Sequence, residues 1–294
     1  MAVRKCTLTV RGQNAVDGAG VKLRRVLSLG TIKDFDPFLM LDGFDSSDPM
    51  DYIKGFPWHP HRGIETVTYL LKGEIEHGDS LGNSGMIGEL QCQWMTAGSG
   101  IIHQEMPQAS ERMLGCQLWV NLPKKDKMTC PAYRDINQEN VSVIREKNTE
   151  IRVLSGNYKN NEGAVKNEYI KVQYLDVALE PDSLWTYNET PNDQTLFIYL
   201  IDGTLAPDAL SENFEEKACA MLMTASSENG QEYDEVTVRS GKEGARFLLV
   251  AARPLKEPVA WGGPIVMNSR EELELAFREL DDNTFIKHDK PQEF

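Results

Sequence analysis

The sequence lacks the features of secreted, disulfide-bonded or membrane-spanning proteins. Its five cysteines are an odd number, widely spaced and without a CxxC pair, so we interpret them as reduced thiols within the structure. The amino-terminal stretch lacks the apolar core of a signal peptide, and no apolar run approaches the roughly 20 residues that cross a bilayer. We therefore expect a cytoplasmic protein, or a nuclear one if the source is eukaryotic.

Basic residues are scarce relative to acidic ones. The chain has 31 Lys and Arg against 45 Asp and Glu, and its formal net charge is -14. Such an excess of negative charge repels phosphate backbones and anionic lipid headgroups. The composition therefore argues against direct nucleic-acid binding and against a membrane partner.

Helical patterns are also scarce, and short β-type runs dominate. These runs are separated by Gly, Pro, Asn and Asp, which predicts an all-β fold. The clearest runs are residues 66–71, 114–122, 169–179, 195–201 and 246–252. One helix is predicted after Asn268 and Ser269, because Glu271 and Glu272 offer capping-box partners and apolar residues then recur at helical spacing.

An internal repeat indicates that one β domain was duplicated. YLLKGEI at residues 69–75 matches YLIDGTL at residues 199–205, an offset of 130, and the strands that follow Gly115 and Gly244 match at an offset of 129. We predict two domains, residues 1–135 and residues 136–294, with the terminal helix in the second. The polar stretch at residues 123–150 is predicted to connect them.

Histidine is rare, yet three of the five histidines fall in two short segments. These are His59-Pro60-His61 and His103-Gln104-Glu105. Residues two apart in a strand share a face, so each segment presents a pair of ligand-type side chains. Pro60 cannot donate to a strand ladder, so we place the first pair at the beginning of a strand. We predict a site for one divalent transition metal.

Two simpler interpretations remain for these histidines. They could be ordinary, partly buried side chains, which is the favoured reading of an isolated His-x-His. They could also form a structural zinc site, although closed zinc sites usually contain cysteine. Counting in twos from His61 places Glu65 on the inward face, as a further ligand or as an acceptor that orients a histidine ring.

Apolar side chains flank the histidine segments. Phe56, Trp58, Met95 and Ile101 could form walls for a planar aromatic substrate, but packing in the barrel core is the favoured reading of each. No substrate contact is assigned from the sequence.

Several longer segments resemble the pirin family of the cupin superfamily. They are HPHRGIETVTYLLKGEIEH (59–77), QWMTAGSGIIHQEMP (93–107), DPFLMLDGFD (36–45), CQLWVNL (116–122) and GGPIVMN (262–268). The resemblance implies two cupin barrels (double-stranded β-helix, jelly-roll) in tandem with a C-terminal helix. It also implies iron in the N-terminal barrel, held by His59, His61, His103 and Glu105.

The C-terminal half is predicted to be metal-free. The repeat offset places Glu189, Pro191 and Thr195 where His59, His61 and Glu65 stand, and it carries His103 and Glu105 to Tyr233 and Glu235. Carboxylates without imidazole partners do not make an iron site with an open coordination position.

The resemblance implies a quercetinase-type dioxygenase. Its substrates would be a flavonol-like aromatic compound and dioxygen, with Glu105 or Glu65 taking the proton of the flavonol 3-hydroxyl and carbon monoxide released on ring opening. The alternative is a non-enzymatic, redox-responsive iron protein that acts through a regulatory protein partner. We expect a monomer.

Overall fold

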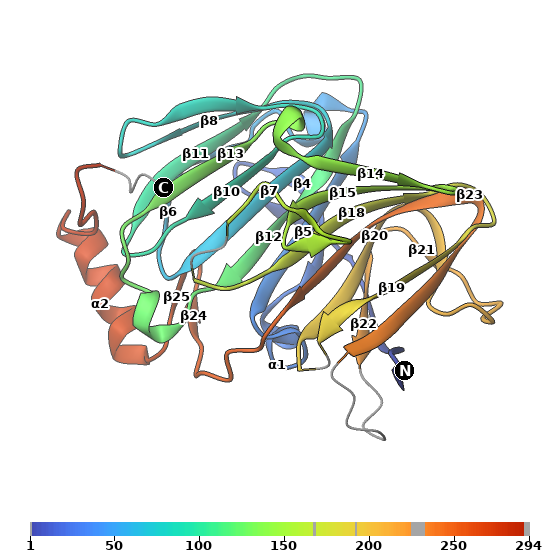
Figure 1. Cartoon of the computed structure of the whole chain (residues 1–294). Coiled ribbons are helices and arrows are strands. Elements are labelled where there is room, and N and C mark those ends of the chain that lie inside the picture. Colours follow the sequence, from blue (N-terminus) through green and yellow to red (C-terminus); the bar gives the residue numbers. More distant parts are fainter. Residues whose placement is uncertain (1, 167–168, 192, 225–232, 291–294) are drawn as a thin grey trace. The chain divides into compact units, whose positions relative to one another are not determined.

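The chain folds into two compact units of β-strands, shown in Figure 1. This computed structural model describes residues 2–166, 169–191, 193–224 and 233–290. The N-terminal unit comprises residues 13–29 and 38–138 and the chain from residue 255 onward, and the C-terminal unit comprises the chain up to residue 12 with residues 30–37 and 139–254. The predicted all-β class is confirmed.

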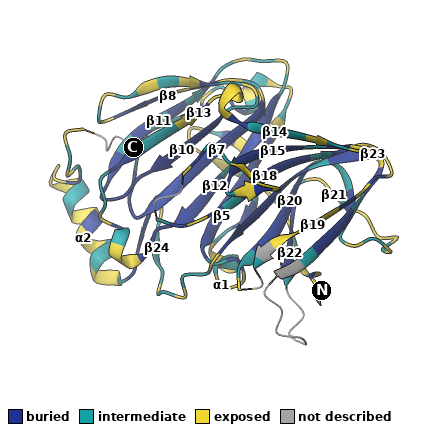
Figure 2. Cartoon of the chain, in the orientation of Figure 1, coloured by how far each residue is buried: buried dark blue, intermediate teal, exposed yellow. Residues whose placement is uncertain are grey.

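The N-terminal unit contains a large antiparallel sheet with the strand order β13-β10-β7-β12-β5-β4-β3. Its strands are β3 (Gln13–Asp17), β4 (Val21–Leu27), β5 (Phe38–Ser46), β7 (Ile64–Lys72), β10 (Cys92–Thr96), β12 (Met113–Asn121) and β13 (Ala132–Ile136). The central strands β7, β10 and β12 are dark blue in Figure 2 because they are buried along nearly their whole length. Such burial on both faces agrees with their place in the interior of the sheet, where neighbours flank each of them.

A smaller antiparallel sheet of the same unit has the order β6-β11-β8-β9. Its strands are β6 (Phe56–His61), β8 (Ile75–Asp79), β9 (Ser84–Ile87) and β11 (Ile101–Pro107). Pro57 and Pro60 are tolerated because β6 is the edge strand. The prediction that the His59 pair begins a strand is wrong, because His61 is the last residue of β6.

The end of the chain adds a short hairpin and a helix to the N-terminal unit. They are β24 (Ala260–Gly262), β25 (Ile265–Met267) and α2 (Arg270–Asp281), and two 3-10 turns, η2 (Pro49–Asp51) and η3 (Lys124–Asp126), complete this unit. The predicted helix start is confirmed, because Ser269 and Glu272 form a capping box at the N-terminus of α2. None of the helices in the described ranges has both the length and the apolar character needed to cross a membrane.

The C-terminal unit is built on one larger sheet with the path β14-β15-β18-β23-β20-β22-β2. The path strands are β2 (Lys5–Arg11), β14 (Ser142–Glu146), β15 (Thr149–Ser155), β18 (Gln173–Leu179), β20 (Thr195–Ala206), β22 (Cys219–Thr224) and β23 (Tyr233–Ala252). Beside the path lie β1 (Ala2–Val3), β19 (Leu184–Pro191) and β21 (Glu215–Glu216). This unit also contains β16 (Asn157–Tyr158), β17 (Asn161–Glu162) and α1 (Ile32–Phe35), and the 3-10 turns η1 (Leu29–Thr31) and η4 (Gln138–Asn140) begin at the last residue of an N-terminal-unit segment.

The two large sheets share one strand order, which supports the predicted duplication. β7 lies between β10 and β12, and its repeat partner β20 lies between β22 and β23. Gly115 and the matched residues after it belong to β12, and Gly244 and the matched residues after it belong to β23. The match continues outward from β5, β4 and β3 to β18, β15 and β14.

The prediction places a single boundary between residues 135 and 136, whereas each observed unit is made of three chain segments. β2 pairs with β22, with Lys5 opposite Thr224, so the first residues belong to the C-terminal unit. The segment from residue 255, including α2, belongs to the N-terminal unit. The predicted connection at residues 123–150 contains β13 and β14, which join different sheets. These pairings join residues far apart in sequence, and the repeat does not encode them.

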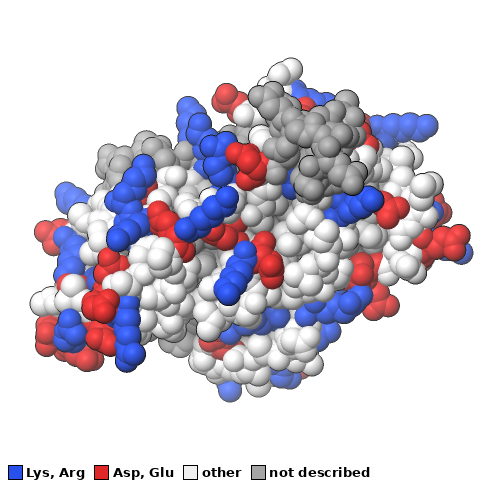
Figure 3. Space-filling view, turned by 90° about the horizontal axis from the view of Figure 1, so that it is seen from below, with Lys and Arg blue, Asp and Glu red and all other residues white. Residues whose placement is uncertain are grey.

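Charged side chains of both signs are interspersed on the face shown in Figure 3. Ion pairs among the described residues include Arg112 with Asp45 and Arg246 with Asp176. The described residues visible on this face therefore form no extended basic patch of the kind that binds nucleic acid.

Candidate metal centre

Three imidazoles meet where β6 and β11 pair in the small sheet. His59 is the cross-strand partner of His103, and His61 lies two residues further along β6 on the same face. One ring nitrogen from each lies within 4.8 Å of the others. The predicted histidine cluster is therefore present, and the pairing of β6 with β11 forms it.

The rings of His59 and His61 are oriented by backbone carbonyls. His59 Nδ1 lies 2.9 Å from the Pro57 oxygen, and His61 Nδ1 lies 3.1 Å from the Pro264 oxygen. A carbonyl oxygen only accepts, so both rings carry their proton on Nδ1 and present a lone pair on Nε2. The two Nε2 atoms face each other at 3.1 Å. Two lone pairs at this separation repel unless a proton or a metal cation lies between them.

His103, on β11, supplies the third ring nitrogen from a buried position. Its side chain is 1 % exposed, and neither ring nitrogen has a hydrogen-bond partner among the described residues. A buried polar group without a partner is costly, and a bound cation would remove that cost. Burial, with the neighbouring histidines, holds the pKa of His103 well below its usual value and lowers the pKa of His61 to about 3. Neutral imidazoles are the form that binds metals, so His61 and His103 are in the state that a transition metal requires.

Glu105 lies beside the triad rather than within it. Its carboxylate is buried, accepts from Gln117 Nε2 at 2.9 and 3.0 Å, and accepts from Thr68 Oγ1 at 3.1 Å. It lines the same cavity as His59 and His61 but is outside the group of nitrogens within 4.8 Å. The ladder between β6 and β11 shifts register between His103 and Glu105. The role of Glu105 as fourth ligand remains a prediction.

Glu65 points away from this centre, so its predicted position is wrong. It lies three residues from Thr68 on the regular strand β7, and therefore on the opposite face. Its carboxylate accepts from Trp94 Nε1 at 3.0 Å and from Thr96 Oγ1 at 2.6 Å. Arg134 adds an ion pair at 3.7 Å. Glu65 is thus a bonded, buried carboxylate of the large sheet and not a base at the triad.

A cavity of about 420 Å³ opens beside the triad and has aromatic walls. Phe56, Trp119 and Trp261 line it, and the rings of Trp119 and Trp261 lie 5.8 Å apart. Among the flanking residues singled out in the sequence, Phe56 is part of the lining. Trp58 is 55 % exposed, whereas Met95 and Ile101 are fully buried.

Polar groups complete the lining of this cavity. Gln117 holds the Glu105 carboxylate, and Arg25 bonds Asp42 at 2.9 and 2.7 Å and Asp17 at 2.6 Å. Sequence reasoning missed these residues and both tryptophans. Two sequence signals could have indicated them. In CQLWVNL, Gln117 and Trp119 are two residues apart and so share one face of a strand, and Trp261 directly precedes the segment GGPIVMN.

Another buried histidine, His77, lies outside the triad. His77 Nε2 lies 2.8 Å from Gln93 Nε2, and its ring stacks on Tyr133 at 5.9 Å. Gln93 also donates to Asp135 at 3.0 Å, so His77 Nε2 acts as the acceptor. His77 therefore belongs to a separate hydrogen-bonded cluster.

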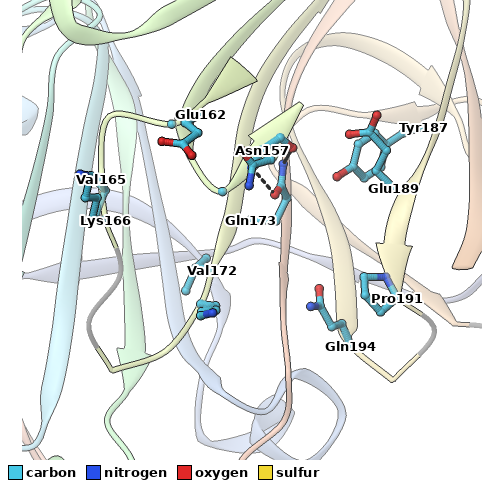
Figure 4. Close-up of a pocket in the computed structure, with 13 residues that line it drawn as sticks. Asn157, Glu162, Val165, Lys166, Val172, Gln173, Tyr187, Glu189, Pro191 and Gln194 are labelled. Atoms are coloured by element: carbon cyan, nitrogen blue, oxygen red, sulfur yellow. Dashed lines mark hydrogen bonds between the residues drawn. The ribbon is translucent and has the colours of Figure 1, made fainter. Parts of the chain in front are cut away.

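The C-terminal unit contains a larger cavity of about 560 Å³ with a different character (Figure 4). Its charged lining residues are Glu162, Lys166, Lys171 and Glu189, and Gln173 bonds the backbone of Asn157. No histidine is among its lining residues in the described part of the chain. The barrel interior here is packed with aromatic rings, since Tyr158, Trp185 and Tyr187 stack on one another.

Comparisons with known proteins also divide the chain into two domains, although the second match includes the segment from residue 255 that the contacts place in the N-terminal unit. The chain matches the Pirin family over residues 20–120 and the family described as Pirin C-terminal cupin domain over residues 174–286. A Pseudomonas aeruginosa protein provisionally named quercetin 2,3-dioxygenase is 43 % identical, over 92 % of this chain and 94 % of that protein. Human pirin is 37 % identical, over 93 % and 91 %. The crystal structure of a quercetin 2,3-dioxygenase from Acinetobacter baumannii has a TM-score of 0.86 and 29 % identity, covering 97 % of this chain and 99 % of that one. The chain belongs to the pirin family and consists of two cupin domains.

Proposed function

We propose that this pirin is an iron-dependent dioxygenase that opens the heterocyclic ring of flavonol-like substrates. The observation that carries the proposal is the juxtaposition of three imidazoles, a buried carboxylate and an aromatic-walled cavity. The names of the Pseudomonas and Acinetobacter relatives support the same reaction.

We assign the metal to His59, His61 and His103, with Glu105 as the fourth ligand or as the adjacent base. A bound redox-active metal would supply the chemistry that lets dioxygen react with an organic substrate. Imidazole nitrogens and one carboxylate suit iron, and they leave positions open for a chelating substrate.

The protein's own residues would bind the substrate and move its proton. Phe56 and Trp119 would stack on a planar ring system, and burial among them would exclude water. Glu105 would take the proton of the hydroxyl group that approaches the triad. The Gln117 amide, bonded to both carboxylate oxygens, would hold Glu105 in place during the transfer.

Loss of flavonol absorbance together with release of carbon monoxide tests the proposal. Iron-loaded protein should consume one dioxygen and release one carbon monoxide for each flavonol, and a His61→Ala variant should do neither. Iron-loaded protein that turns over none of a range of flavonols would contradict it. That result would favour the alternative, a redox-responsive regulatory protein. The name of human pirin specifies neither activity.

A further inference from the structure

The terminal segment, residues 255–290, lies against the strand ends that carry the triad. We infer that this segment is part of the metal centre and that Arg62 and Lys127 are positioning residues that fasten it to His61. The inference rests on the proposed metal site but not on the proposed reaction. It assigns a role to two buried cations that are not themselves ligands.

The segment reaches the centre at Pro264. The Pro264 carbonyl accepts from His61 Nδ1 at 3.1 Å and so fixes the tautomer and the direction of that ring. The next residues continue the contact, because Val266 N donates to the Arg62 oxygen at 3.1 Å and Ile265 forms a parallel bridge with Arg62. Figure 1 shows β24 and β25 beside the end of β6. The orientation of one predicted ligand therefore depends on a residue about 200 positions away in sequence.

Arg62 follows His61 and binds the more distant part of the segment. Its guanidinium donates to the Phe285 oxygen at 2.9 Å, pairs with Glu279 at 2.7 Å and lies 4.1 Å from the centre of the Phe285 ring. Nε donates to the Ser99 oxygen at 2.6 Å. Arg62 is 1 % exposed, so this charge is tolerated only while these partners stay in place.

Lys127 makes a second, independent fastening. Its ammonium donates to the Val266 oxygen at 2.9 Å, to the Gly63 oxygen at 2.8 Å and to Asn121 Oδ1 at 2.7 Å. Lys127 is also 1 % exposed. The backbones meet closely here, because a Cβ on Gly63 would lie 2.0 Å from the Val266 oxygen, and Gly63 itself has φ +78°. Only glycine allows this approach.

These contacts couple the metal to the segment. If the segment moved away, Arg62 and Lys127 would each lose partners while still buried, and the His61 ring would lose the acceptor that orients it. A metal that requires the oriented ring must therefore favour the docked segment. By linkage, the docked segment must favour the metal by the same factor.

Hydrogen exchange on the wild-type protein tests this coupling without any substitution. Metal-free and Ni²⁺-loaded protein are compared, with Ni²⁺ as a redox-silent probe. We expect metal to slow exchange in peptides covering residues 262–286 as well as in β6 and β11, and to leave the β14–β15 hairpin unchanged. Slower exchange in β6 and β11 alone, with no change at residues 262–286, would overturn the inference.

A matched pair of variants tests the positioning role of Arg62. Arg62→Lys keeps the charge but removes the fork that binds two backbone oxygens, whereas Arg270→Lys changes an exposed arginine of α2 that pairs with Glu274. Metal affinity of Arg62→Lys should fall about 10- to 100-fold, as for other residues that orient metal ligands, and the Co²⁺ absorption spectrum should change. Arg270→Lys should match the wild type.

Equal metal affinities and Co²⁺ spectra for the two variants would also overturn the inference. If Arg62→Lys does not fold, Phe285→Ala takes its place, because it removes the ring under the guanidinium and leaves every predicted ligand intact. Neither readout uses a flavonol. Metal binding with coupling but no turnover would contradict the proposed function alone, and metal binding without coupling would contradict this inference alone.

Discussion

At the residue scale, the behaviour of the centre depends on which ring nitrogen is already engaged. His59 and His61 use Nδ1 for backbone carbonyls and turn Nε2 toward each other. His103 is buried with both nitrogens unpartnered in the described structure. In His59 and His61, the backbone therefore engages Nδ1 and leaves Nε2 directed toward the predicted metal.

Substitution of His61 tests this arrangement at a single residue. We expect His61→Ala to reduce metal content to near zero while the far-ultraviolet circular dichroism stays unchanged, because the sheets are held by other contacts. Elemental analysis measures the metal. The matched control is His288→Ala, which removes a histidine outside the triad. Full metal content in His61→Ala would contradict the assignment.

The two carboxylates distinguished by the structure should respond differently to the same substitution. Glu105→Gln should weaken metal binding, since that side chain lines the cavity beside the triad. Glu65→Gln should leave metal affinity unchanged but lower the free energy of unfolding by about 1 to 3 kcal/mol, because Trp94 or Thr96 loses its acceptor. Calorimetric metal titration and urea unfolding measure the two effects. Equal loss of metal affinity in both variants would show that the face assignment is wrong.

Sequence reasoning found the triad but misplaced Glu65, for a definite physical reason. Alternation holds within one strand, so His59 and His61 were correctly placed together. Counting on from His61 to Glu65 crosses a break, because β6 ends at His61, β7 begins at Ile64, and Gly63 adopts φ +78° between them. The alternation of side chains between the two faces therefore does not continue from β6 into β7 across this turn.

At the scale of elements, α2 shows how far a local signal reaches. Its capping box was predictable because Ser269 and Glu272 are neighbours in sequence, and the structure has both reciprocal bonds. Its place in the N-terminal unit was not predictable, because that depends on Arg62, which lies more than 200 residues earlier. Pairing of β2 with β22 escaped prediction for the same reason.

Removal of the cap tests the contribution of this helix start. Ser269→Ala should lower stability by about 1 kcal/mol, because the amide of Glu272 loses its acceptor. Thermal unfolding followed by circular dichroism measures the change. Ser269→Asp keeps a capping oxygen and should unfold within a few tenths of 1 kcal/mol of the wild type. If Ser269→Asp lost as much stability as Ser269→Ala, loss of the capping hydrogen bond would not be the cause of the destabilisation.

At the scale of the whole molecule, one architecture occurs twice with different interiors. The repeat offset predicted the duplication, and the matching strand orders agree with it. In the C-terminal unit, β19 pairs with the first part of β23 as β6 pairs with β11. Its barrel core contains the packed rings of Trp185, Tyr187 and Phe247, where the N-terminal unit has its histidine triad. The absence of metal from this unit remains a prediction.

Anomalous scattering from crystals of metal-loaded protein, collected at the absorption edge of the bound metal, tests the central claim most directly. We predict one peak per chain, bonded to His59, His61 and His103 at about 2.0 to 2.2 Å. A peak of comparable height within residues 151–252, or a peak whose ligands exclude the three histidines, would contradict the account.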